Sequence, residues 1–384
     1  MDGKRKDVYR LVSPMNNPKT DMESYEEVNL VANSNFEVLA TFRYDPGFTR
    51  CSPSKKEIFE SPDPRLGLRD EEIRREIIKE DYLSYLRVRE VNSGSGLLEN
   101  IQHPDVWKQD CKTIVCHSIE DMLQVIYERF FLLEEQYQRL RIALSYFKID
   151  FNTSLNDLLK LLVENLINCK EGSAEYDVIQ KMINEKQCYK IRVLVSKKGS
   201  IRIEAIQLPM APILTLTTNC DSASTYFIKT MLNGFLNHST INWDVVISSE
   251  PLNGSAFTSF KTTSRDHYAR ARARMQTAIN NLRGSEPATA VSQCEILFPN
   301  KSGQLMEGSI TNVAVIRRDH NGTKKYVTPR LATGCLCGTM RHYLLRLGLI
   351  EEADIKIESL TIGDEVLLFN GVMGCIKGTV KTKY

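Results

Sequence analysis

Short apolar runs separated by tight turns fill the second half of the sequence and constrain its fold more than any other feature. The runs CEILFP, GSITNVAVI, KKYVTP and EVLLFNGVMGCIKGTV predict β-strands, the last of them two strands around a glycine turn. Helical segments lie between these runs. Strands and helices that meet at such short junctions predict the α/β or α+β class.

The ends of two helices in this half are predicted from their capping residues. The first should begin after Ser264, a good N-cap, with Asp266 in its first turn and Gly284 after its end. The second should cover 339–347 and stop at Gly348.

The first half predicts fewer strands and more helix. FEVLATFRY predicts a strand on which Leu39, Thr41 and Arg43 share one face, because side chains alternate along a strand. A hairpin is predicted around Lys198-Gly199. Helical periodicity covers 119–147, and a further helix is predicted over 154–168 with Ser154 as its N-cap.

The length of 384 residues exceeds one typical core and favours two domains. The prolines at 209 and 212 predict a connector between the two halves. We therefore expect an N-terminal α/β domain over 1–208, with a loop-rich insert near 45–120, and a C-terminal domain over 209–384.

Charge and cysteine usage limit the classes of function. A net charge of +2 gives no general attraction to nucleic acid or to anionic membranes, and no apolar stretch is long enough for a membrane helix. The ten cysteines are scattered and form no CxxC pair, and the six histidines show no zinc spacing. We expect a cytoplasmic protein with reduced thiols and no catalytic metal.

Lys261 is the first candidate for chemistry. It follows the apolar run AFTSF and precedes a helix, a position where a lysine can lie in a dry cleft. Desolvation would lower the pKa of its amine and make it a nucleophile or base. A solvated lysine at a strand end is the alternative, and taken alone this residue favours that alternative.

Glu307 opens the stretch EGSITN after an apolar strand, where its carboxylate could pair with a protonated ring nitrogen. A simple strand–turn glutamate is the alternative. Asn312 could order the turn in either case.

Several groups could bind a phosphate. The amides of Thr339 and Met340 open a helix, and Asn370-Gly371-Val372 could form a nest of backbone N–H groups. Arg139 either clamps a phosphate or forms an ion pair with Glu135, four residues earlier, on a solvated helix face. Arg43 and Arg192 lie on predicted strands and could converge on a dicarboxylate.

These pieces occur in an order that resembles the class-IV aminotransferase family, also called the fold-type IV pyridoxal-phosphate enzymes. The family pattern is E-x-[STAGCI]-x-x-N, a strand ending in Thr-Pro, and a G-x-x-R turn into a helix. Here these are EGSITN at 307–312, TP at 328–329 and GTMR at 338–341. Lys261 lies where the family has its catalytic lysine. LLEEQYQRL resembles the family's H-x-x-R-L helix, with Gln136 in place of the usual histidine.

The resemblance implies the cofactor pyridoxal 5′-phosphate (PLP), bound covalently to Lys261, with Glu307 at its ring nitrogen. It implies that the phosphate is held by Arg139, Thr339, Met340 and Gly371. It also implies a small N-terminal α/β domain and a larger C-terminal domain with a barrel-like sheet. Family members commonly complete the site across a dimer interface. The insert could cover that edge instead, so monomer and homodimer both stay open.

Within the family the likeness is strongest to the longer, fungal 4-amino-4-deoxychorismate lyases. This implies a small-molecule substrate, aminodeoxychorismate, that is converted to 4-aminobenzoate and pyruvate for folate biosynthesis. The substrate is expected to lie against Arg43, Arg192 and Thr41. A branched-chain or D-amino acid transaminase with the same cofactor residues is one alternative, and a non-catalytic binding protein is another.

Overall fold

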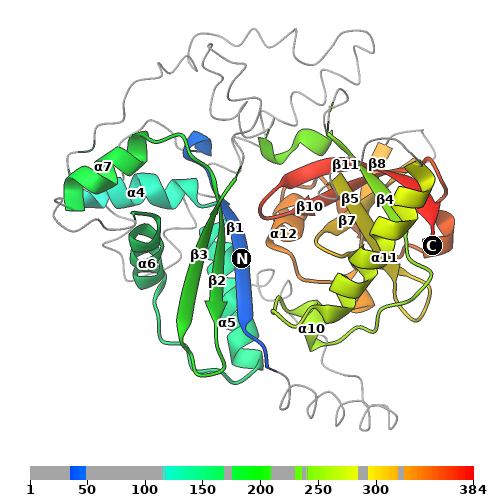
Figure 1. Cartoon of the computed structure of the whole chain (residues 1–384), viewed down its shortest axis with the longest axis horizontal. Helices are drawn as coiled ribbons and strands as arrows, with labels where there is room; N and C mark the ends of the chain where they lie inside the picture. Colours follow the sequence, from blue (N-terminus) through cyan, green and yellow to red (C-terminus); the bar gives the residue numbers. More distant parts are fainter. Residues whose placement is uncertain are drawn as a thin grey trace, which may run out of the picture.

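The structure is a computed structural model. It describes residues 35–48, 116, 118–167, 175–208, 230–235, 239, 241–283, 293–318 and 324–384. Residues 1–34 and nearly all of the predicted insert at 45–120 lie outside this part of the chain. The mixed α/β class is confirmed, with a small antiparallel sheet and a larger, curled sheet (Figure 1).

The small sheet consists of β1 (Val38–Tyr44), β2 (Tyr189–Val195) and β3 (Ile201–Gln207), in that order. Both pairs of neighbouring strands are antiparallel. The predicted hairpin between β2 and β3 is confirmed, and Gly199 lies in its turn with a φ of 78° that favours glycine. The helix-covered face of this sheet is apolar, because Ala40 lies opposite Val193, and Phe42 opposite Ile191.

Helices cover that apolar face. They are α4 (Ile119–Arg129), α5 (Leu133–Tyr146), α6 (Leu155–Ile167) and α7 (Glu175–Asn184) (Figure 1). The helix predicted around 154–168 is confirmed as α6. Ser154 is its N-cap, since Ser154 Oγ accepts a hydrogen bond from the amide of Asp157 at 3.1 Å.

The helical periodicity predicted over 119–147 is confirmed, but it forms two helices, because the chain breaks between α4 and α5. Residues 130–132 leave the helix to bind the end of β1, where the Phe131 amide donates to the Arg43 carbonyl at 2.8 Å. Phe130 forms a bridge with Tyr44, and Leu132 adopts a φ of 54°. The helical periodicity continues across the break, whereas the backbone hydrogen bonds go to the strand.

The larger sheet has the strand order β6-β5-β4-β11-β10-β7-β8-β9. β4 pairs in parallel with both of its neighbours, so the sheet is mixed. Its strands are β4 (Asn242–Ile247), β5 (Cys294–Pro299), β6 (Leu305–Gly308), β7 (Asn312–Arg318), β8 (Lys324–Pro329), β9 (Glu351–Ala353), β10 (Glu365–Asn370) and β11 (Gly374–Lys383).

The helices beside this sheet that the structure describes from end to end are α10 (Ala256–Ser259), α11 (Asp266–Arg283) and α12 (Thr339–Arg346). α12 confirms the predicted helix that closes at Gly348. Ser264 is not the N-cap of α11, because the Ala269 amide donates to the Arg265 carbonyl at 3.0 Å and the helix begins one residue later than predicted. The preceding residues stay extended because Thr263 pairs with Glu37.

The free edge of β1 joins the two sheets. The Leu39 amide donates to the Lys261 carbonyl at 2.8 Å, and the Arg43 amide donates to the Gly371 carbonyl at 3.1 Å. Segments from both halves of the chain therefore meet along one strand. The predicted connector lies in 209–229, outside the described residues, so the division into domains 1–208 and 209–384 stays a prediction.

Candidate active site

Lys261 lies directly after α10, at the edge where the two sheets meet. A capping box fixes this short helix, in which the Ser255 amide donates to Thr258 Oγ1 at 2.9 Å. The hydrogen bond from Leu39 then fixes the Lys261 backbone. Both anchors hold the start of the lysine side chain in one place.

The Lys261 side chain keeps some accessible surface, yet its amine is strongly desolvated. Burial lowers the pKa of this amine well below its usual value, and the charges of Arg265 and Arg139 lower it further. Glu307 acts in the opposite direction but does not cancel these effects. This environment favours the neutral amine, which is the form that acts as a nucleophile or base.

Glu307 lies at the end of β6 with 3% of its surface exposed. Tyr268 on α11 donates a hydrogen bond to its Oε1, and the Leu336 amide donates to Oε2 at 2.9 Å. Burial raises the pKa of this carboxyl to about 7, while the two hydrogen bonds oppose that shift. Sequence reasoning missed Tyr268, because only packing brings α11 to β6.

Asn312 orders the segment before α12. Its Nδ2 donates to the Leu336 carbonyl at 3.0 Å, so Leu336 is held by Glu307 through its amide and by Asn312 through its carbonyl. A Cβ at position 338 would lie 2.0 Å from Asn312 Oδ1, so only glycine fits there. The turn residues of the sequence pattern thus position the start of α12.

Three side chains meet around the first residue of α12. Gln136 Nε2 donates to Thr339 Oγ1 at 2.7 Å, and Arg139 Nη2 donates to Gln136 Oε1 at 2.8 Å. Arg139 is only 9% exposed, so it does not lie on a solvated helix face as the alternative expected. The amides of Thr339 and Met340 make no hydrogen bond to another residue in the described ranges.

Gly371 closes this cluster from the turn between β10 and β11. A Cβ there would lie 2.8 Å from Gln136 Nε2 and 3.2 Å from the Thr41 carbonyl oxygen. The predicted nest has one N–H donor fewer than expected, because the Val372 amide donates to Asn370 Oδ1 at 2.9 Å. Glycine is thus needed where β1, α5 and α12 converge.

Three parts of the site fit three parts of pyridoxal phosphate: its phosphate, its ring nitrogen and its aldehyde. The start of α12, the Arg139 guanidinium and the close approach at Gly371 suit a phosphate. The buried carboxyl of Glu307 suits a protonated ring nitrogen, and the depressed pKa of Lys261 suits bonding to an aldehyde.

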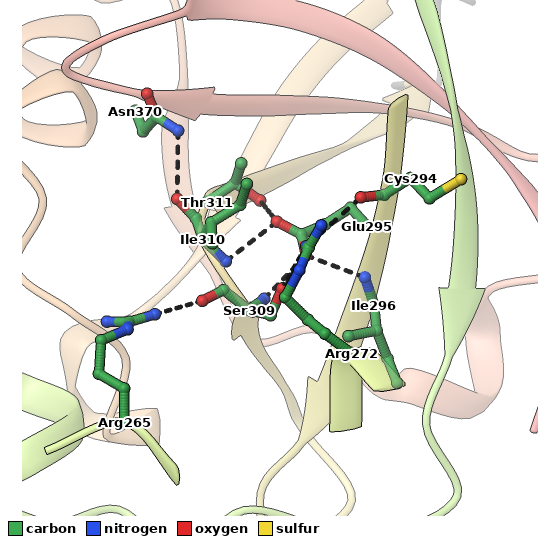
Figure 2. A network of polar contacts seen from close by, with 9 residues as sticks. All are labelled: Arg265, Arg272, Cys294, Glu295, Ile296, Ser309, Ile310, Thr311 and Asn370. Carbon is green, nitrogen blue, oxygen red and sulfur yellow. Dashed lines mark hydrogen bonds and ion pairs between the residues drawn. The ribbon is translucent and has the colours of Figure 1, made fainter. Parts of the chain in front are cut away.

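A second buried carboxylate, that of Glu295 on β5, supports the turn that follows Glu307 (Figure 2). Its oxygens accept hydrogen bonds from the Ser309 amide at 3.0 Å, the Ile310 amide at 3.1 Å and Thr311 Oγ1 at 2.8 Å. Arg272 lies 3.4 Å from it.

The network continues on both sides of this turn (Figure 2). Asn370 Nδ2 donates to the Ile310 carbonyl at 3.2 Å, and Arg265 donates to the Ser309 carbonyl. The turn after Glu307 is thereby linked both to the turn that carries Gly371 and to the residue whose charge lowers the pKa of Lys261.

The three residues predicted to bind substrate share one face of the small sheet. Thr41 lies opposite Arg192, and Arg43 lies two residues further along β1. Both arginines already contact carboxylates, with Arg43 Nε 2.6 Å from Asp45 Oδ2 and Arg192 Nη1 2.6 Å from Glu204 Oε2. Their role towards a substrate stays a prediction.

Arg341 of the GTMR turn has a structural position. It is 3% exposed, and its Nη2 donates to the Pro329 carbonyl at 2.8 Å and also contacts Glu352. It therefore holds α12 against the end of β8.

Within the described part of the chain, no cluster of three or more histidine, cysteine, aspartate or glutamate side chains is placed to bind a metal ion. In the same residues, no helix combines the length and the apolar character that crossing a membrane requires.

Comparisons with known proteins give a family and a near relative. The model of the amino-transferase class IV family matches residues 119–379. An aminodeoxychorismate lyase of Saccharomyces cerevisiae is 83% identical over 374 residues, which cover 97% of this chain and all of that protein.

Two solved structures overlap with this one at lower identity. A branched-chain amino acid aminotransferase from Escherichia coli has 15% identity and a TM-score of 0.41, over 66% of this chain and 70% of its own. The branched-chain aminotransferase of Thermoproteus uzoniensis has 17% identity and a TM-score of 0.42, over 66% of this chain and 72% of its own.

Proposed function

The chain belongs to the class IV aminotransferase family, and from this membership we propose that it is a PLP-dependent aminodeoxychorismate lyase that forms 4-aminobenzoate and pyruvate for folate biosynthesis. The observation that carries this proposal is the identity of 83% to the lyase of Saccharomyces cerevisiae along nearly the whole chain. The site geometry supports it, because the residues around Lys261 suit the cofactor on which this family depends.

Each part of the site would hold one part of the cofactor. Lys261 would bind its aldehyde, and Glu307 its ring nitrogen. The phosphate would lie among Arg139, Gly371 and the amides of Thr339 and Met340. When bound, PLP supplies an electron sink for the negative charge that develops at the substrate carbon next to the amine.

Lys261 is the acid and base of the proposed reaction. Desolvation favours the neutral form of its amine, and once the substrate's amine has taken its place at the aldehyde, this amine can take the proton from the ring carbon that bears the substrate's amine. The carbon–oxygen bond to the enolpyruvyl group then breaks. The ring becomes aromatic, and the protonated amine returns its proton to the departing three-carbon fragment, which leaves as pyruvate.

Tyr268 and Leu336 keep Glu307 in place for this chemistry. Their hydrogen bonds stabilise the ionised carboxylate against the effect of burial. An ionised Glu307 would keep a proton on the ring nitrogen, so proton abstraction by Lys261 becomes easier.

The direct experiment is to incubate the purified protein with PLP and aminodeoxychorismate and to follow 4-aminobenzoate by its fluorescence. We expect 4-aminobenzoate and pyruvate in equal amounts without any added keto acid. Lys261→Ala should lower this turnover by about 10³-fold or more. Turnover that requires a keto acid would instead identify a transaminase.

Borohydride reduction gives an independent test of the cofactor site. Mass spectrometry of the reduced, digested protein should find the pyridoxyl group on the peptide that contains Lys261. A tag on another lysine would contradict the assignment.

A further inference from the structure

The face of the small sheet that lies opposite its apolar core is rich in charge. Because directly paired residues of antiparallel strands point to the same side, the register places Lys190 on this face opposite Arg43, and Arg192 opposite Thr41. Glu204 on β3 lies on the same face opposite Arg192. Sequence reasoning selected the two arginines and missed Lys190.

The two arginines contact carboxylates, whereas Lys190 does not. Asp45 lies 2.6 Å from Arg43, and Glu204 lies 2.6 Å from Arg192. Within the described residues, Lys190 forms no ion pair within 4.0 Å. On this face the described cations Arg43, Lys190, Arg192 and Arg202 outnumber the carboxylates Glu37, Asp45 and Glu204 by one. Among these described cations, Lys190 is the one without a carboxylate within 4.0 Å.

Lys190 also acts electrostatically on Lys261. Its charge is one of those that lower the pKa of the Lys261 amine, and the Lys261 backbone binds the edge of β1 through Leu39. Lys190 itself is partly buried, and burial together with the charge of Arg192 lowers the pKa of its amine. An anion bound beside Lys190 would therefore stabilise the charged form of its amine.

We propose that Lys190 binds one of the two carboxylates of the substrate and is a specificity-determining residue of this site. The proposal rests on the proposed function, because that substrate carries two carboxylates and therefore more negative charge than a simple amino acid. The flexible lysine stem can follow a carboxylate that moves during the reaction, whereas the arginines are fixed by Asp45 and Glu204.

The test compares three variants of the full-length protein loaded with PLP. Lys190→Met removes the charge at similar length, and Lys190→Arg keeps the charge. Lys160→Met is the matched control, because Lys160 is exposed on α6, which packs on the opposite face of the sheet. Steady-state lyase kinetics, the absorbance of the bound cofactor and the urea midpoint are measured for each.

We expect Lys190→Met to raise the KM for aminodeoxychorismate by about 10- to 100-fold, with a much smaller change in kcat and an unchanged cofactor spectrum. Lys190→Arg should keep most of the wild-type KM, and Lys160→Met should keep all of it. If Lys190→Met does not fold, Lys190→Gln tests the same loss of charge.

Two results would overturn the proposal: an unchanged KM in Lys190→Met, or the same rise in Lys160→Met. These results differ from a failure of the proposed function itself. In that case the wild-type protein would release no 4-aminobenzoate at all, and the borohydride tag on Lys261 would still report whether the cofactor is bound.

Discussion

Gln136 Nε2 donates a hydrogen bond to Thr339 Oγ1 at 2.7 Å and so joins α5 to the first residue of α12. The same amide accepts a hydrogen bond from Arg139 through its Oε1. A glutamine can do both at once, since its amide has a donor end and an acceptor end. The residue that departs from the family's histidine therefore connects the two elements that would hold the phosphate.

Gln136→Leu should weaken cofactor binding. It removes both hydrogen bonds while keeping a similar volume, and since one such bond contributes about 1 kcal/mol, the loss of both should raise the Kd for PLP by up to about 30-fold. Absorbance titration with PLP measures this. Gln138→Leu is the control on the same helix, because Gln138 bonds only to Glu134 within the described structure. Equal losses in both variants would contradict a specific role for Gln136.

Gly371→Ala should disturb the same place from the other side. The new methyl group would lie 2.8 Å from Gln136 Nε2 and would push the amide away from Thr339. We expect a similar rise in the Kd for PLP. The double variant of Gly371→Ala with Gln136→Ala should lose less affinity for PLP than the two single variants lose together. Without the Gln136 amide, the new methyl group has no Nε2 to displace. Additive losses in this cycle would show that the two residues act separately.

Glu295→Gln should destabilise the protein by roughly 3 kcal/mol. The substituted amide cannot accept all the hydrogen bonds from residues 309–311, and it leaves the charge of Arg272 without its carboxylate. Urea unfolding measures the loss. Glu250→Gln is the comparison: its carboxylate pairs with Arg274 on the surface, so the expected loss is below about 1 kcal/mol. A free energy of unfolding equal to that of wild type in Glu295→Gln would contradict this prediction.

Glu307→Gln should change how stability depends on pH in the cofactor-free protein. The folded-state pKa of Glu307 is raised from 4.5 to about 7, so the wild-type protein loses stability as pH rises through that window. Glutamine does not ionise, so the variant avoids this loss. The free energy of unfolding of the variant minus that of wild type should therefore be up to about 3 kcal/mol larger at about pH 8 than at about pH 4.5. Urea unfolding at both pH values measures it, and parallel pH profiles would contradict it.

Local sequence patterns were sufficient to predict most of the described elements. The cap at Ser154, the hairpin turn at Gly199 and the short helix before Gly348 depend on a few neighbouring residues, so their chemistry is visible in the sequence. The EGSITN and GTMR stretches likewise carry their own turn geometry. The roles predicted for Lys261 and Glu307 came from the resemblance to the family, in whose pattern each occupies a fixed place.

Contacts between distant segments decided the rest. The break after α4 arises because residues 130 and 131 bind the end of β1, although their helical periodicity is intact. Tyr268 reaches Glu307 across 39 positions of the chain, and Gln136 reaches Thr339 across 203. Periodicity and motifs describe neighbours along the chain and contain no information on such pairs.

The sequence alone therefore predicted which residues would carry the chemistry, because a lysine, a glutamate and a glycine turn at fixed spacing match the family pattern. Their environment came from the packed structure. The pKa values of Lys261 and Glu307, the contacts of Arg43 and Arg192, and the place of Lys190 all depend on burial and on charges from other strands. Desolvation and electrostatic interaction act through space, and the distances that set them exist only once the two sheets have packed along β1.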